Sequence, residues 1–219
     1  MKILALGDCN TLGVQSCKYN AFPEHFAQAL NAEVKNLGHT MATSREIVNL
    51  YRDHYHDHDI ITLSVGLTDS WRGFKYAPYV LYYPNNIFRK WGRKLVKKYK
   101  KWARKLGLTK LFGLDHVTSP ALYEKNVRYV IENSKNSVIF LMDTLPKQQE
   151  DRNVDIVHYN TILDDIAADY SHVIRVKYYD YFHARRDSLY SDKTHLNADG
   201  YAEVTKRLMD AYQTHQATK

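Results

Sequence analysis

The sequence predicts an α/β protein built around a parallel sheet, and three observations predict this fold class. Short apolar segments of strand length alternate with segments in which apolar residues recur at helical spacing. Residues 59–65 are almost continuously apolar, as in a parallel strand that helices cover on both faces. Several of the apolar segments end at glycine. We therefore expect βαβ units whose strands end together at one edge of the sheet, where ligands bind in such folds.

Each element has a local signal. Strands are expected at residues 2–6, 33–37, 59–65, 137–142 and 172–176, and helices at 20–30, from 43, from 119, around 156–166 and at 199–212. Thr43 and Glu46 have the spacing of a capping box, which predicts that a helix begins there. Ser119 followed by Pro120 predicts another helix start, because proline is favoured in the first turn.

Length and composition predict one domain, residues 1–219, with an insertion at 71–117. Hydrophobic residues make up 44% of the chain and charged residues 25%, which is typical of a globular protein. The formal charge of +7 is local, because residues 89–110 hold eleven of the 31 Lys and Arg and no acidic residue. A charge confined to one segment argues against a general nucleic-acid-binding domain.

Two cysteines, Cys9 and Cys17, do not form a disulfide framework. The apolar run before Gly7 is too short for a signal peptide, and no apolar run is long enough to span a membrane. We therefore expect a cytoplasmic protein with reduced thiols, with a peripheral position at the inner membrane face as a further option. The oligomeric state is not predicted.

The insertion contains one long amphipathic helix. Its apolar stripe consists of Ile87, Trp91, Leu95, Tyr99, Trp102 and Leu106, and its other faces are almost wholly Lys and Arg. In one interpretation the stripe packs on the domain and the charges are solvated. In the other, the helix lies on an anionic membrane surface or covers an anionic substrate. The candidate contacts are then Trp91, Lys94, Lys98 and Trp102.

Polar clusters follow the expected strands at four places. They are Gly7-Asp8-Cys9 with Gly13, then Gly38, then Gly66 to Asp69, and finally Asp192 to His195. An aspartate three residues before a histidine can orient the imidazole and leave its other nitrogen free to act as a base. The histidine-rich segment 53–59 offers metal ligands, but we expect a solvated loop there and no metal site.

These clusters resemble the blocks of the SGNH (GDSL-type) hydrolase superfamily of esterases, lipases and polysaccharide acyl-modifying enzymes. The resemblance covers the chain apart from the insertion, and it implies a flavodoxin-like three-layer α/β/α fold with a five-stranded parallel sheet. It implies Cys9 as the nucleophile, His195 as the general base and Asp192 as the residue that orients His195. The oxyanion hole would use the N–H groups of Cys9 and Gly38 and the side chain of Thr68. No cofactor is implied.

The chain departs from the family pattern at two positions, with Cys9 in place of serine and Thr68 in place of asparagine. A cysteine is a competent nucleophile when a neighbouring imidazolium or a helix N-terminus lowers its pKa. The thioester that it forms is resolved by water or by another nucleophile. We therefore expect an acyl-ester hydrolase or acyltransferase acting on an acylated small molecule, a glycan or a lipid-linked glycan. The alternative is a binding or scaffold protein that kept the fold and lost the chemistry.

Overall fold

The computed structural model describes residues 1–218 and contains the predicted sheet. Its five strands are β1 (Lys2–Gly7), β2 (Glu33–Gly38), β3 (Ile60–Ser64), β6 (Val138–Met142) and β7 (Val173–Val176). Their order is β2-β1-β3-β6-β7, and every neighbouring pair is parallel. Gly7 at the end of β1 pairs with Gly38 of β2 and Ser64 of β3, so three of the predicted clusters begin at the same edge.

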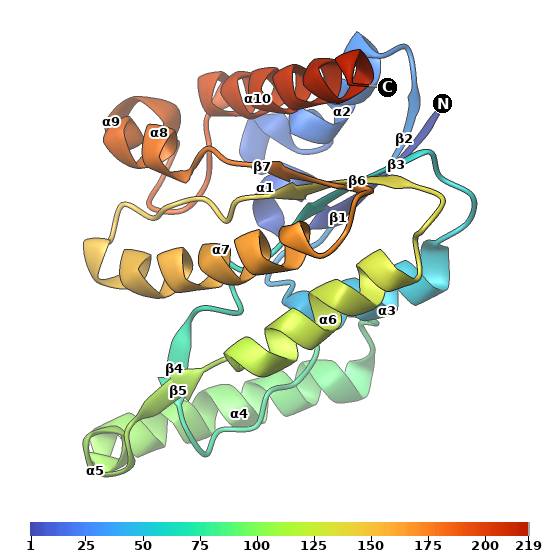
Figure 1. Ribbon diagram of the computed structural model, residues 1–219. Helices are drawn as coiled ribbons and strands as arrows, with labels where there is room; N and C mark the ends of the chain where they lie inside the picture. Colours follow the sequence, from blue (N-terminus) through green and yellow to red (C-terminus); the bar gives the residue numbers. More distant parts are fainter. Residues whose placement is uncertain (219) are drawn as a thin grey trace.

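Helices cover both faces of the sheet and complete the three-layer fold (Figure 1). One face carries α2 (Phe22–Ala29) and α10 (Ala198–Ala217), and the other carries α3 (Ser44–His54), α6 (Pro120–Glu132) and α7 (Asn153–Ala168). Each face of the sheet has its own buried apolar cluster. The flavodoxin-like α/β/α architecture that the resemblance implied is confirmed.

Local capping signals placed two of the helix starts correctly. The Thr43 N–H donates to Glu46 Oε2 (2.9 Å), which completes the capping box of α3. Ser119 is the N-cap of α6, and Pro120 is its first residue. The sequence did not predict the short elements, because fewer than two helical turns give no readable periodicity. They are α1 (Cys9–Leu12), α8 (Tyr179–Ala184), α9 (Arg186–Leu189) and the 3₁₀ turns Gln15–Cys17 and Glu150–Arg152.

The insertion leaves and rejoins the domain at one point. Val117 N–H donates to the carbonyl oxygen of Trp71 (2.7 Å), and a two-stranded antiparallel ribbon of β4 (Arg72–Phe74) and β5 (Leu114–His116) extends from there. The ribbon carries α4 (Ile87–Lys105) and α5 (Leu108–Phe112), which lie beyond α3 and α6 in Figure 1. Within residues 1–218, no helix has the length and apolar character needed to cross a membrane.

Asp69 ties the turn after β3 to the start of α3. Its carboxylate accepts hydrogen bonds from the Ser44 N–H (2.9 Å) and the Ser44 hydroxyl (2.8 Å), and its side chain is fully buried. Burial is the main cause that raises the pKa of Asp69 from 3.8 to about 6, against the hydrogen bonds from Ser44. Asp69 therefore joins the turn that carries Thr68 to the start of α3.

The raised pKa of Asp69 predicts a pH-dependent stability. Between pH 3.8 and about 6 the folded state holds a proton on Asp69 that the unfolded state has released, so rising pH removes stability. Relative to Asp69→Asn, the wild-type protein should lose up to about 3 kcal/mol of unfolding free energy between pH 4 and 7. Urea unfolding at each pH measures this difference. Asp57→Asn, in the exposed loop before β3, is the control, and equal pH slopes for Asp69→Asn and Asp57→Asn would contradict the account.

Candidate active site

Cys9 is the first residue of α1, directly after β1. Asp8 is the N-cap of this helix, and its Oδ1 accepts a hydrogen bond from the Asn10 N–H (2.8 Å). Cys9 is 7% exposed and packs against Leu67 and Ile156. The short helix places the thiol at the carboxyl edge of the sheet, where the resemblance puts a nucleophile.

His195 and Asp192 form a close pair on the loop before α10. His195 Nδ1 lies 2.7 Å from Asp192 Oδ2, and Asp192 Oδ1 accepts the N–H groups of Thr194 (2.8 Å) and His195 (2.9 Å). Partial burial acts to raise the pKa of Asp192, but these hydrogen bonds outweigh it and hold the pKa below its usual value. A carboxylate bound to Nδ1 favours the tautomer in which Nε2 is free to accept a proton.

Asn10 joins the cysteine turn to the histidine loop. Its Nδ2 donates to the Thr194 carbonyl (3.2 Å), and its Oδ1 accepts the Leu196 N–H (3.2 Å). Asn10 is buried, its hydrogen bond with Leu196 lies inside the protein, and its hydrogen bond with Thr194 is partly buried. The sequence analysis missed this residue because its partners lie 184 and 186 positions away along the chain.

The carboxyl group of Asp8 is also close enough to His195 to interact with its charge. Burial raises its pKa from 3.8 to about 6, while the Asn10 N–H and the charge of His195 act in the opposite direction. Asp8 is thus an acidic group inside the site, within electrostatic reach of His195. From the sequence alone, Asp8 was expected only to form part of the turn.

A lowered pKa, the condition under which a cysteine is an activated nucleophile, is not found for Cys9 in this structure. Burial, followed by the nearby charge of Asp8, raises the pKa of the thiol well above its ordinary value. The N–H groups at the start of α1 oppose this shift but are outweighed. Burial thus favours the neutral thiol of Cys9, and a reaction at its sulfur calls for a base.

The structure differs from expectation at Gly38, whose N–H is already engaged. It donates to Asn36 Oδ1 (2.8 Å), so it is not a free donor for an oxyanion. A Cβ at Gly38 would fall 2.1 Å from the Leu12 nitrogen, which shows that glycine is needed there for close packing of β2 against α1. Thr68, by contrast, is buried and lines a cavity. Met41, on the loop after β2, lines the same cavity and has a positive φ of 63°.

Lys147 is a buried cation beside this site, and the sequence analysis missed it. It lies on the loop after β6, and its Nζ is 4.1 Å from the centre of the Trp71 ring. Burial lowers its pKa from 10.5 to about 8, while the nearby Cys9 and Asp8 act to raise it. No local pattern marks one lysine among many as buried.

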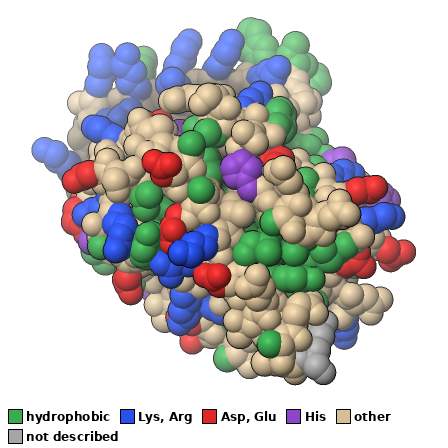
Figure 2. Space-filling view, turned by 90° about the horizontal axis from the view of Figure 1, so that it is seen from above, with side chains coloured by type: hydrophobic (Ala, Val, Ile, Leu, Met, Phe, Trp, Pro, Cys, Tyr) green, Lys and Arg blue, Asp and Glu red, His purple; other side chains and the backbone are tan. Residues whose placement is uncertain are grey.

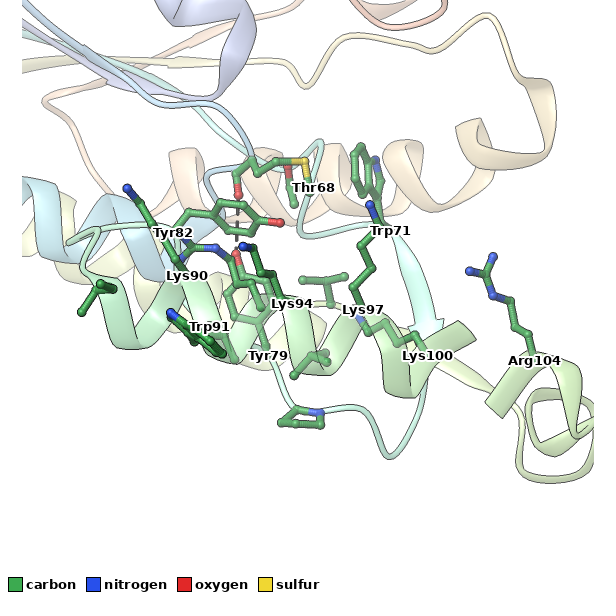
Figure 3. Close-up of a pocket in the computed structure, with 17 residues that line it drawn as sticks. Thr68, Trp71, Tyr79, Tyr82, Lys90, Trp91, Lys94, Lys97, Lys100 and Arg104 are labelled. Atoms are coloured by element: carbon green, nitrogen blue, oxygen red, sulfur yellow. Dashed lines mark hydrogen bonds between the residues drawn. The ribbon is translucent and has the colours of Figure 1, made fainter. Parts of the chain in front are cut away.

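The cavity beside Thr68 has a volume of about 720 Å³ and separates α4 from the body of the domain. Lys94 and Lys97 point from α4 toward the side where Thr68 and Trp71 lie (Figure 3). Most of the apolar stripe is nevertheless exposed, with Leu95 63% and Trp102 70% exposed, and only Ile87 and Trp91 of the stripe also border the cavity. The interpretation in which the stripe packs on the domain is therefore wrong.

The four candidate contacts on α4 fall on different sides of the helix. Lys94 and Trp91 line the cavity, whereas Lys98 and Trp102 do not and are exposed. Seen from above, Lys and Arg side chains gather along one edge of the molecule with hydrophobic side chains beside them (Figure 2).

The histidine-rich segment 53–59 forms the end of α3 and the loop before β3. His54 Nε2 lies 3.1 Å from the Tyr83 hydroxyl, and His58 Nδ1 lies 2.9 Å from the His56 carbonyl oxygen. These histidines thus contact their neighbours in the protein.

A three-layer α/β/α fold in which the His195 loop is hydrogen-bonded to the turn after the first strand is the arrangement expected of an SGNH-type hydrolase. Residues 5–203 match the GDSL-like Lipase/Acylhydrolase family, and the chain belongs to this family of ester-hydrolysing enzymes. A comparison with curated proteins finds no match.

Solved structures of similar fold include two hydrolases. The acetylxylan esterase Axe2 of Geobacillus stearothermophilus is 15% identical with a TM-score of 0.65, and the match covers 96% of this chain and 93% of that one. LAE5, an alpha/beta hydrolase from the metagenome of Lake Arreo, is 14% identical with a TM-score of 0.65, covering 96% and 94%. At this level of identity, the likeness establishes the shared fold.

Proposed function

We propose that this protein cleaves or transfers acyl esters with Cys9 as the nucleophile, His195 as the general base and Asp192 as the group that orients His195. The observation that carries the proposal is the pair of hydrogen bonds through Asn10, which holds the His195 loop against the turn that bears Cys9. The short contact between His195 and Asp192 supports it further.

In the first half-reaction, Cys9 Sγ bonds to the acyl carbon as His195 Nε2 takes the thiol proton. The C–O bond of the ester then breaks, and His195 returns the proton to the leaving alcohol. In the second half, water or another hydroxyl attacks the thioester, His195 takes its proton, and the thiol is regenerated as the acid or new ester leaves. Because the pKa of Cys9 is raised, proton transfer to His195 accompanies the attack and no thiolate forms beforehand.

The negative charge on the acyl oxygen needs donors that are already in place. The Cys9 N–H at the start of α1 and the hydroxyl of buried Thr68 are the proposed donors. Lys147 adds a positive charge near Cys9. This charge favours loss of the proton from the thiol, and it stabilises the negative charge that develops on the acyl oxygen.

The proposed substrate is an acylated glycan or lipid-linked glycan, and the acetylxylan esterase among the structural neighbours supports a glycan ester. Turnover of p-nitrophenyl acetate by the purified protein tests the acyl chemistry, and addition of glycerol as an acceptor separates transfer from hydrolysis. Absence of p-nitrophenol release would reject the proposal in favour of a binding protein that kept only the fold.

We also propose that the outer face of α4 binds an anionic membrane surface. Ile87, Trp91, Leu95, Trp102 and Leu106 are each more than 60% exposed, and the helix between them carries no acidic residue. An exposed apolar stripe flanked by lysines fits a helix that lies at the boundary between lipid headgroups and acyl chains.

Cosedimentation with phosphatidylglycerol-containing vesicles tests this surface. Leu95→Glu/Trp102→Glu should reduce the bound fraction at least about fivefold, because two charges enter the apolar stripe. Val154→Glu, which places a charge on an exposed valine of α7, is the control and should bind normally. Equal binding to neutral phosphatidylcholine vesicles, or sedimentation without vesicles through self-association, would contradict the proposal.

A further inference from the structure

The inner face of α4 lines the cavity with positive charge. Six of its side chains take part, namely Lys90, Arg93, Lys94, Lys97, Lys100 and Arg104, and no acidic residue lines the cavity. Amphipathic helices on a domain normally turn their apolar face inward. Here six basic side chains line the space between the helix and the domain, together with Ile87, Trp91 and Val96, so apolar packing does not close this space.

These charges lack acidic partners in the part of the chain that the structure describes. None of the ion pairs formed within residues 1–218 includes a residue of α4. Arg93 donates to the Leu81 carbonyl oxygen (2.6 Å) and to Asn85 Oδ1 (2.8 Å), which anchors the helix, but both acceptors are neutral. A concave surface lined by one sign of charge concentrates ions of the opposite sign.

The wall opposite α4 is held rigidly by the body of the domain. Buried Glu46 accepts the Tyr82 N–H (2.7 Å) and the Tyr79 hydroxyl (3.0 Å), so the loop that connects β4 to α4 is fixed to α3. Glu46 itself does not line the cavity, and its carboxylate is occupied by these donors and by Thr43. The cavity is thus preformed, with a volume in the usual range of ligand pockets, roughly 300–1,000 Å³.

The cavity also extends to one residue of the proposed reaction site, whereas Cys9 and His195 do not line it. Thr68, the proposed oxyanion donor, and Trp71, whose ring lies beneath Lys147, are both part of its lining. The Trp71 Nε1 is buried and has no hydrogen-bond partner within the described part of the chain.

We propose that this cavity binds a phosphate-bearing substrate, so that the inner basic face of α4 holds the phosphate while the acyl group lies at Thr68 and Cys9. Several unpaired lysines match the two or more negative charges of phosphate esters better than a single carboxylate, and lysine binds phosphate as a point charge. The role of the ligand as substrate rests on the proposed acyl chemistry, but the binding site stands on the cavity itself.

Calorimetric titration with inorganic pyrophosphate tests the site. Wild-type protein should bind pyrophosphate, and Lys94→Glu/Lys97→Glu should weaken binding at least tenfold. Lys98→Glu/Lys105→Glu makes the same charge change on the same helix outside the cavity lining, and should weaken binding less than threefold. Absence of binding at millimolar pyrophosphate, or equal weakening in both double variants, would overturn the inference.

Two further arms separate the possible outcomes. Displacement of pyrophosphate by glucose 1-phosphate or by dihexanoyl phosphatidic acid supports the inference, and which of them competes assigns the phosphate to a soluble or a lipid ligand. Binding of pyrophosphate without turnover of p-nitrophenyl acetate would reject the proposed reaction and retain the anion site. Turnover of p-nitrophenyl acetate without binding of pyrophosphate would retain the proposed reaction and reject the anion site.

Discussion

Cys9→Ala is expected to lower the turnover of p-nitrophenyl acetate by a factor of about 10³ or more, because it removes the atom that bonds to the acyl carbon. Cys9→Ser should retain part of the activity. A hydroxyl occupies nearly the same place at the start of α1, and His195 serves as the base for either nucleophile. Steady-state assays of the three proteins at one pH measure the difference.

The pair of variants separates chemistry from structure. Cys9 packs against Leu67 and Ile156, so both substitutions perturb the same small apolar contact. Equal activity of Cys9→Ala and wild type would show that another group attacks the ester. Equal loss of unfolding free energy in the alanine and serine variants, with different activities, would confirm that the difference is catalytic.

Asp192→Asn is expected to lower kcat by a factor of about 10² to 10⁴ with little change in KM. The asparagine Oδ1 retains an acceptor for the backbone N–H groups of Thr194 and His195, so the loop keeps its shape. The negative charge that stabilises a protonated His195 is lost, however, and the amide no longer fixes the tautomer.

Asp187→Asn, on the exposed surface of α9, is the matched control and should leave kcat within twofold of wild type. Activity of Asp192→Asn within threefold of wild type would mean that His195 does not depend on its neighbour for catalysis. The role assigned to the pair would then be wrong.

Local signals in the sequence accounted for the sheet and for several helix boundaries. Strand-length apolar segments and the Thr43–Glu46 capping box depend on neighbours within a few residues, so they can be recognised before the fold is known. The Asp192–His195 pair is also local, three residues apart. The resemblance to the family then supplied the role of Cys9.

Other features depend on tertiary contacts that no local pattern contains. Periodicity identified the two faces of α4 but not which of them borders the domain, where six basic side chains line the cavity while most of the apolar stripe is exposed. Burial raises the pKa of Cys9 and lowers the pKa of Lys147, and the burial of either residue depends on the whole fold. The role of Asn10 requires the two ends of the chain to meet.

The central claim is that Cys9 carries the acyl group during the reaction. Rapid acid quenching of the protein with p-nitrophenyl acetate, followed by intact-mass measurement and peptide mapping, tests it directly. The account predicts one added acetyl group on the peptide that contains Cys9, and none on Cys9→Ala. An acetyl group that forms equally in Cys9→Ala, or that maps to Cys17, would contradict the account.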